Sequence, residues 1–254
     1  MAAGSKREAT STAKDGSPVR VERTRRGLVL RIGQQHASAL RPGKLATGSV
    51  WDLLALPLRI GTLPAAPRVL LLGVGGGSVV PLLRAFAPEC TIVGVELDAD
   101  VLRAARESFG IEQHGIELVH GDAIEFLARD RRKWDVVIED VFGHDGKRLV
   151  KPSAMIEPGL ARAARKVAKH GLLVSNSVHE AAAARRVFVR EFGGGLDLAL
   201  SDCSNHILVA GRSPPSAREL RGVVSAVPEM RSVARRLAIR SFSDPSGWLR
   251  RIAP

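Results

Sequence analysis

The chain has 254 residues, of which 45% are hydrophobic and 25% charged, and its formal net charge is +12. This length and composition predict a globular protein with one full core and a small appendage. Its apolar runs stop far short of the roughly 20 residues that span a membrane, and its N-terminus lacks an apolar signal core, so we expect a soluble, cytoplasmic protein. Cys90 and Cys203 lack CxxC spacing and favour neither a disulfide framework nor a metal site.

The positive charge is weak evidence for a nucleic-acid partner. The arginines are spread over both termini and several expected helices, and no aromatic residues are interleaved with them. We therefore expect a small-molecule partner, no membrane contact and no nucleic acid, while a homodimer remains open.

The N-terminal part divides into a tail and a small β-rich piece. Residues 1–17 are rich in Ser, Thr, Lys and Gly, which predicts a disordered tail. Within residues 18–62, the runs VRVERT and GLVLRIG flank a basic turn and predict a β-hairpin. The run TGSVWDLLALPL then predicts a short helix that Pro57 ends or bends.

Residues 63–212 predict an α/β domain. Apolar runs of strand length alternate with amphipathic runs of helix length, which indicates βα units and a parallel sheet. The expected parallel strands are VLLLGV, TIVGVEL, IELVHG, WDVVIED and GLLVSN. One residue separates the last two runs, LDLALSDC and NHILVAGR, so these must pair as an antiparallel hairpin. A Rossmann-like parallel sheet that ends in such a hairpin is the class I methyltransferase fold.

Residues 213–254 predict a C-terminal helical extension. Pro214 and Pro215 mark a linker, and the spacing of Val233 and Leu237 predicts a short amphipathic helix with arginines on its outer face.

A glycine loop and an acid predict a site for an adenosine-type ligand. Gly73, Gly75 and Gly77 follow the first parallel strand, where a missing side chain lets the backbone approach a ligand. A tight turn without a ligand is the alternative interpretation. Glu96 ends the second strand and can accept two hydrogen bonds from a ribose diol.

Two later acids extend this candidate site. Asp122 follows the third strand, where its carboxylate, or the amide of Ala123, can meet the adenine amino group. It can equally cap the next helix with Glu125 in a capping box, and the two roles can coexist. Asp140 ends the fourth strand, and strand alternation allows at most one of Glu139 and Asp140 to face the ligand.

These motifs resemble the spermidine synthase family of polyamine aminopropyltransferases. The segments VLLLGVGGG, VGVELDADVL, HGDAIEFL and WDVVIEDVF carry the resemblance, which covers roughly residues 20 to 212. Leu71 is apolar as in this family, whereas most class I methyltransferases have an acid there. The D-x-F pattern Asp140-Val141-Phe142 is similar to the divergent spermidine-synthase-like branch. The resemblance implies a transferase of polyamine biosynthesis with S-adenosylmethionine or its decarboxylated form as donor, and places Gln35 near the nucleoside.

The chain departs from the active synthases on the amine side. Gly76 occupies the place of the family's loop Asp, which is associated with the amino group of the aminopropyl chain. Gly143 replaces the second Asp of a D-x-x-D pattern that holds the diamine, and Asp145 comes two residues too late. The family's pocket commonly includes tyrosines, and this chain has none. We therefore expect a diamine such as putrescine to be a poor acceptor.

The expected reaction transfers an alkyl group, aminopropyl or methyl, from a sulfonium nucleoside to an unidentified acceptor, with Asp140 as the base. Asp140 could instead only cap its loop. We also expect the loop amides from Gly75 to Ser78 and the start of the following helix to donate hydrogen bonds to the carboxylate of intact S-adenosylmethionine. Two alternatives to this function are a non-catalytic nucleoside-binding or scaffold protein and a basic methyltransferase acting on an anionic substrate.

Overall fold

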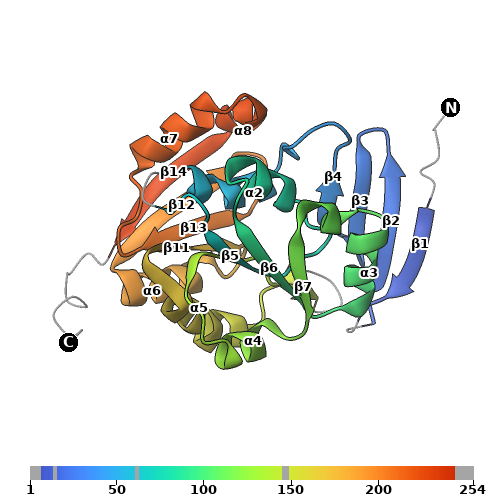
Figure 1. Cartoon of the computed structure of the whole chain (residues 1–254), viewed down its shortest axis with the longest axis horizontal. Helices are drawn as coiled ribbons and strands as arrows, with labels where there is room; N and C mark the ends of the chain where they lie inside the picture. Colours follow the sequence, from blue (N-terminus) through green and yellow to red (C-terminus); the bar gives the residue numbers. More distant parts are fainter. Residues whose placement is uncertain (1–6, 14–15, 61–62, 145–148, 244–254) are drawn as a thin grey trace.

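The computed structural model describes residues 7–13, 16–60, 63–144 and 149–243. Its main layer is an eight-stranded sheet with the order β14-β12-β13-β11-β8-β5-β6-β7, and helices lie on both faces (Figure 1). A four-stranded antiparallel sheet, β1-β2-β3-β4, stands beside it. This arrangement confirms the predicted α/β class I methyltransferase fold with a small N-terminal β-rich piece.

The strands of the two sheets and of a short hairpin have the following bounds: β1 Arg7–Thr12, β2 Pro18–Thr24, β3 Gly27–Ile32, β4 Gln35–Leu40, β5 Arg68–Leu72, β6 Thr91–Glu96, β7 Ile116–His120, β8 Trp134–Glu139, β9 Gly143–His144, β10 Leu149–Val150, β11 Val167–Ser177, β12 Gly194–Leu200, β13 His206–Gly211 and β14 Leu237–Ser243.

The helices are α1 Trp51–Ala55, α2 Val80–Phe86, α3 Ala99–Glu107, α4 Ala123–Arg129, α5 Leu160–Lys166, α6 Ala181–Phe192, α7 Ala217–Ala226 and α8 Arg231–Ala234, with short turns η1 Leu56–Arg59, η2 Ile111–His114, η3 Met155–Gly159 and η4 Pro228–Met230. In the described part of the chain, no helix is both long and apolar enough to cross a bilayer.

The five predicted parallel strands and the final antiparallel hairpin are present. Strands β7, β6, β5, β8 and β11 run parallel, and β13 pairs antiparallel with both β11 and β12. Strand β5 is buried on both faces, because Val69 and Leu71 belong to one core cluster and Leu70 and Leu72 to the other. The continuous apolar run of β5 is therefore a consequence of its central position.

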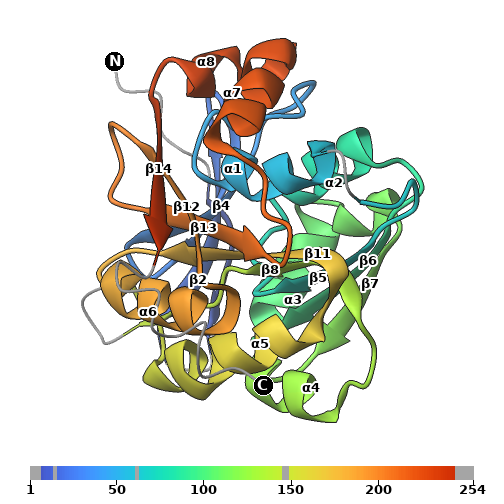
Figure 2. The ribbon, with the colours of Figure 1, turned by 90° about the vertical axis from the view of Figure 1, so that its left-hand side faces the viewer.

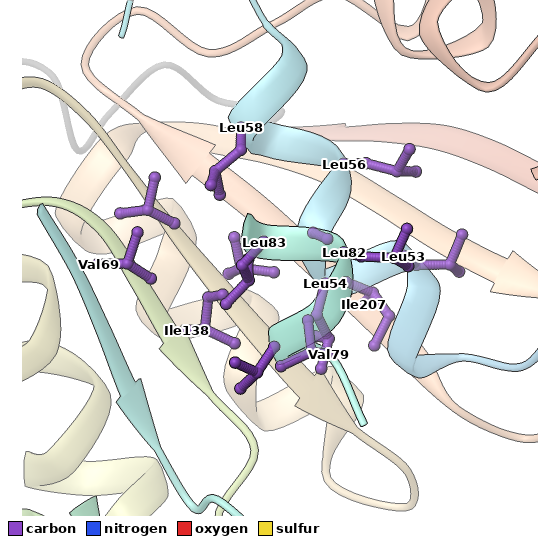
Figure 3. Close-up of a cluster of buried hydrophobic side chains, with 14 of the residues drawn as sticks. Leu53, Leu54, Leu56, Leu58, Val69, Val79, Leu82, Leu83, Ile138 and Ile207 are labelled. Atoms are coloured by element: carbon purple, nitrogen blue, oxygen red, sulfur yellow. The ribbon is translucent and has the colours of Figure 1, made fainter. Parts of the chain in front are cut away.

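Two helical layers enclose the sheet. Helices α1, α2, α7 and α8 lie on one side and α4, α5 and α6 on the other (Figure 2). On the first side, leucines of α1 and α2 pack against Val69, Ile138 and Ile207 of the sheet (Figure 3). This packing fixes the carboxyl ends of the parallel strands relative to one another.

The N-terminal sheet is larger than the predicted hairpin. Strands β2 and β3 form that hairpin, β4 continues it, and β1 adds to its edge with Ser11 opposite Val19. Strand β1 falls in the segment that was predicted as a disordered tail, and there the prediction was wrong. The reason is that edge pairing uses backbone groups, so a polar segment can join a sheet without apolar side chains.

The C-terminal extension is not wholly helical. The predicted helix around Val233 ends at Ala234, and Leu237–Ser243 form β14, which pairs antiparallel with β12 along its length. In this strand Ile239 is buried while Ala238 and Arg240 are exposed. The strand covers the otherwise open edge of β12, so tertiary pairing overrides the helical spacing of the sequence.

Candidate active site

A cavity of about 690 Å³ opens at the carboxyl ends of β5, β6 and β8. The N-terminal sheet, the segment from Ser49 to Trp51 and the β9–β10 hairpin form its other walls. This volume lies within the usual range for small-molecule sites, and open α/β sheets bind ligands at this edge.

The cavity brings together seven of the eight site residues predicted from the sequence. They are Gln35, Gly73, Gly75, Glu96, Asp122, Ala123 and Asp140. Gly77 lies outside the lining, and a Cβ there would be 2.2 Å from Cδ1 of Ile111. Position 77 requires a glycine because its φ is positive and because Ile111 packs against it.

Gly73 allows two strand ends to meet. Its φ is +80°, and a Cβ at this position would be 2.4 Å from the carbonyl oxygen of Asp140. A side chain would therefore push the end of β8 away from the glycine loop.

The amides of the glycine loop are already bonded within the protein. Those of Val74 and Gly75 donate to Oε2 of Glu96, at 3.0 and 2.9 Å. The amide of Gly76 donates to Oγ of Ser38 at 2.7 Å, and that of Gly77 to the carbonyl of Val74. The expectation that the amides from Gly75 onward donate hydrogen bonds to the carboxylate of S-adenosylmethionine is therefore wrong for Gly75, Gly76 and Gly77.

Glu96 lines the cavity and also holds the glycine loop in place through hydrogen bonds. Besides the two loop amides, it accepts a 3.2 Å hydrogen bond at Oε1 from the amide of Asp98. Burial raises the pKa of Glu96, although these amide donors favour its charged form. Backbone amides, those of Val74, Gly75, Leu97 and Asp98, use much of the acceptor capacity of this carboxylate, and its two hydrogen bonds to a ribose diol stay a prediction.

Asp122 has its predicted capping role and also lines the cavity. Its Oδ1 accepts from the amides of Ile124 and Glu125, at 2.7 and 3.1 Å, at the start of α4. The predicted capping box is not formed, because the side chain of Glu125 forms an ion pair with Arg129 instead. The cap fixes the position of Asp122 beside the cavity, next to the predicted Ala123.

Asp140 is held by a chain of two amides. Nδ2 of Asn176 donates to its Oδ1 at 2.7 Å, and Nδ2 of Asn205 donates to Oδ1 of Asn176 at 2.9 Å. Burial raises the pKa of Asp140 to about 7; the Asn176 hydrogen bond and the charge of Lys151 oppose this shift, whereas the Glu139 and Glu96 charges add to it. A carboxyl group with this pKa can accept a proton near neutral pH.

Glu139 points away from the cavity, as strand alternation predicts. It is fully buried, with its Oε1 2.5 Å from Nζ of Lys151 and its Oε2 accepting from Ser175 at 2.6 Å. Lys151 follows β10, so this buried pair fastens the β9–β10 hairpin to β8.

Gly76 is buried outside the cavity lining. A Cβ there would be 2.9 Å from Cβ of Ser38 and 3.0 Å from Cδ1 of Phe109. This backbone therefore has no room for an acid that reaches the donor from position 76. Gly143 does line the cavity, and Asp145 lies outside the described residues.

Among the residues that the sequence did not predict are Ser38, which holds the glycine loop, and Asn176 and Asn205, which hold Asp140. Asn176 ends a predicted strand and Asn205 begins another, so their positions at strand ends were the available signal. In the described part of the chain, no group of three His, Cys, Asp or Glu side chains is arranged to hold a metal ion.

Comparisons with known proteins agree with this geometry. No family model matches the chain. A polyamine aminopropyltransferase of Vibrio vulnificus is 29% identical over 136 residues, which cover 49% of this chain and 44% of the relative. A Drosophila melanogaster protein named eEF1A lysine and N-terminal methyltransferase homolog is 33% identical over 81 residues, covering 30% of this chain and 12% of that protein. The chain thus spans less than half the length of these curated relatives.

Solved structures match over more of the chain. A probable spermidine synthase from Corynebacterium glutamicum has a TM-score of 0.71 at 20% identity and covers 96% of this chain and 92% of its own. Human methyltransferase-like protein 13, solved in complex with SAH, has a TM-score of 0.56 at 19% identity. The match covers 77% of this chain and 93% of that protein's chain.

The fold is that of the class I S-adenosylmethionine-dependent transferases. In both sequence and fold the chain is similar to the spermidine synthases, which confirms the resemblance predicted from its motifs.

Proposed function

We propose that this protein transfers an alkyl group, aminopropyl or methyl, from a sulfonium nucleoside to a small-molecule acceptor. The observation that carries the proposal is the arrangement of three acids in one cavity. Glu96 and Asp122 lie on one side of the glycine loop, where an adenosine would bind, and Asp140 lies on the other side.

The proposed reaction needs positioning and removal of one proton. The acceptor nucleophile forms a bond to the carbon next to the positively charged sulfur, while the carbon–sulfur bond breaks and its electron pair returns to sulfur. A neutral thioether leaves, and the acceptor's proton passes to Asp140. Its raised pKa suits this role.

The donor can be S-adenosylmethionine or its decarboxylated form. The relatives are named for aminopropyl transfer and for methyl transfer, so an alkyl group of either kind is compatible with the comparisons. The bonded amides of Gly75, Gly76 and Gly77 give no advantage to a donor that carries a carboxylate. In this proposal residues 63–212 are the nucleoside-binding domain, residues 18–62 form the small N-terminal piece and residues 213–254 the C-terminal extension; of these two, the described residues 18–60 include a wall of the site, and residues 213–243 pack against the main domain.

The test is calorimetry with methylthioadenosine and S-adenosylhomocysteine, followed by an assay of thioether release from each donor. We expect Glu96→Gln to weaken binding of both thioethers, since the amide loses acceptor capacity toward a ribose hydroxyl. Glu125→Gln is the matched control, because this exposed acid lies on the same side but outside the cavity lining. Equal binding by the native protein and Glu96→Gln would contradict the nucleoside assignment.

Asp140→Asn separates a transferase from a non-catalytic nucleoside-binding protein. We expect this variant to bind the thioethers as the native protein does and to release thioether from either donor at least about 100-fold more slowly. A native protein that binds them but turns over neither donor with any acceptor would support the scaffold alternative.

A further inference from the structure

A second hollow, of about 650 Å³, lies on the edge of the sheet opposite the candidate active site. It is formed by the loop 130–133, which enters β8, and by the end of α5, which precedes β11. The two helices that bring the chain to this edge, α4 and α5, lie side by side (Figure 2). Six of its eight lining residues are cations, namely Arg129, Arg131, Arg132, Lys133, Arg165 and Lys166. The other two are Asp130 and Ala128.

The acid in this lining is already occupied by donors of the protein. Oδ1 of Asp130 accepts from Nε of Arg132 at 2.7 Å, and its Oδ2 accepts from Nε1 of Trp134 at 2.8 Å. The side chain of Asp130 is only 7% exposed. Asp130 therefore anchors Arg132 and leaves most of the positive charge of the hollow without a carboxylate.

Two lysines hold the walls of the hollow at a fixed separation. Nζ of Lys133, in the loop, donates to the carbonyl of Arg165 at the end of α5. Nζ of Lys166, in α5, donates in return to the carbonyl of Asp130 in the loop. Each ammonium has three donors and uses one here on a neutral carbonyl. The lysines thus connect the walls and keep donors and charge for a ligand.

The arginines add one fixed and two unpaired guanidinium groups. That of Arg132 lies over the ring of Trp134, with Cζ 4.6 Å from the ring centroid, in addition to its bond to Asp130. Arg131 and Arg165 are exposed, one on each wall, and within the described part of the chain neither side chain is paired with a carboxylate. Donors from both walls can therefore reach one ligand.

Helix ends explain only part of this charge. Arg129 lies in the last turn of α4, and Arg165 and Lys166 lie in the last turn of α5, where cations interact favourably with the helix dipole. The same reason does not apply to the loop cations at 131–133, which follow the helix. Like charges held this close repel one another, and an anion bound among them would relieve the repulsion.

We propose that this hollow binds a compact polyphosphate group. Phosphate oxygens accept paired hydrogen bonds from arginine and single ones from lysine, and a short phosphate chain presents many oxygens to both walls at once. None of the described lining residues is aromatic, so the hollow has no surface on which a base could stack. Recognition is therefore of the phosphate chain itself. The inference does not depend on nucleoside binding or alkyl transfer.

The experiment is calorimetry with tripolyphosphate at about 0.15 M salt, where attraction to scattered surface charges is largely screened. The site variant combines Arg131→Gln with Arg165→Gln. The matched control combines Arg25→Gln with Arg26→Gln, which removes the same charge from an exposed turn outside the hollow. All four side chains are exposed, so both variants should fold, and thermal unfolding checks this. We expect the site variant to bind at least about tenfold more weakly and the control to change affinity less than about twofold.

Two further probes distinguish the source of the negative charge. Citrate is an anion without phosphate, and a single-stranded oligouridylate without terminal phosphates presents only a nucleic-acid backbone. Saturable tripolyphosphate binding that the site variant alone weakens, with both other probes bound at least about tenfold more weakly, supports the proposal. Absence of saturable binding, equal losses in the two variants, or citrate binding as tight as that of tripolyphosphate would overturn it. Tighter binding of the oligouridylate would also overturn it and would assign the hollow to nucleic acid.

Discussion

Asp140 is the residue whose protonation state should control the rate. Its pKa of about 7 lies above the ordinary value of 3.8, so it is largely protonated below pH 7 and cannot accept the acceptor's proton there. We expect the rate of thioether release, expressed per neutral acceptor, to rise about tenfold per pH unit up to about pH 7 and then to level off. Asp140→Asn should remove this inflection and lower the rate by about 100-fold or more. An unchanged pH profile in the variant would show that Asp140 is not the base.

Asp122 combines a capping role with a position in the cavity, and substitution can separate the two. Asp122→Ala removes the acceptor of the Ile124 and Glu125 amides and should cost about 1 kcal/mol of unfolding free energy. Asp122→Asn keeps a capping oxygen and should lower the unfolding free energy by only about a few tenths of a kcal/mol. Urea denaturation measures both values. Similar losses in the two variants would mean that charge, rather than capping, stabilises the start of α4.

Among the elements, the C-terminal extension has an unexpected connection to the site. Nη2 of Arg236 donates to the carbonyl of Gly48 at 2.6 Å, and Nη1 contacts both carboxylate oxygens of Asp202. Gly48 adjoins the Ser49–Trp51 wall, and Asp202 adjoins the segment that carries Asn205. One side chain before β14 thus joins two loops that lead into walls of the cavity.

Loss of this connection should disturb the part of the cavity next to Asp140 more than the part that binds the nucleoside. We expect Arg236→Ala to slow thioether release from the donor about fivefold, equivalent to roughly 1 kcal/mol, with little change in methylthioadenosine binding. Arg235→Ala is the control, because Arg235 is the exposed neighbour. An assay of thioether release and calorimetry with methylthioadenosine measure the two effects separately. Equal losses of release rate and of methylthioadenosine affinity would indicate a general loss of structure instead.

Elements differ in how far their sequence predicts them. The strands β5, β6 and β8 were predictable because burial on both faces requires continuous apolar runs, and Glu96, Asp122 and Asp140 followed from their positions at strand ends. The spacing of Val233 and Leu237 suits a helix, and only the open edge of β12 makes β14 a strand. The Asn176–Asn205 contact was not predictable, because it depends on the antiparallel return of β13 beside β11.

For the whole molecule, the positive charge is not concentrated at the site. Of the Arg and Lys residues that the structure describes, Arg31 alone lines the cavity. It already donates to Glu22 and to the carbonyl of Gln34. This distribution gives no support to the alternative of a basic methyltransferase with an anionic substrate.

The C-terminal extension should unfold together with the rest of the molecule. Met230 and Leu220 are fully buried in the core cluster that contains α1 and α2. We expect Met230→Ala to lower the unfolding free energy by roughly 2–5 kcal/mol within a single thermal transition. Ser225→Ala, at an exposed position of α7, should change it by less than about 0.5 kcal/mol. Two separate calorimetric transitions would show instead that the extension is an independent unit.

The hydrogen bonds that fasten the glycine loop have a consequence for its motion. Glu96 and Ser38 hold the amides of Val74, Gly75 and Gly76 in the free protein, so this loop is ordered before a ligand binds. Ligand binding therefore costs little further conformational entropy in the loop. Addition of a nucleoside should therefore leave the hydrogen–deuterium exchange rates of these amides nearly unchanged, even though the ligand lies beside them. The part of the cavity that binds the nucleoside would then be a rigid template, and ligand-induced protection should be found elsewhere around the cavity.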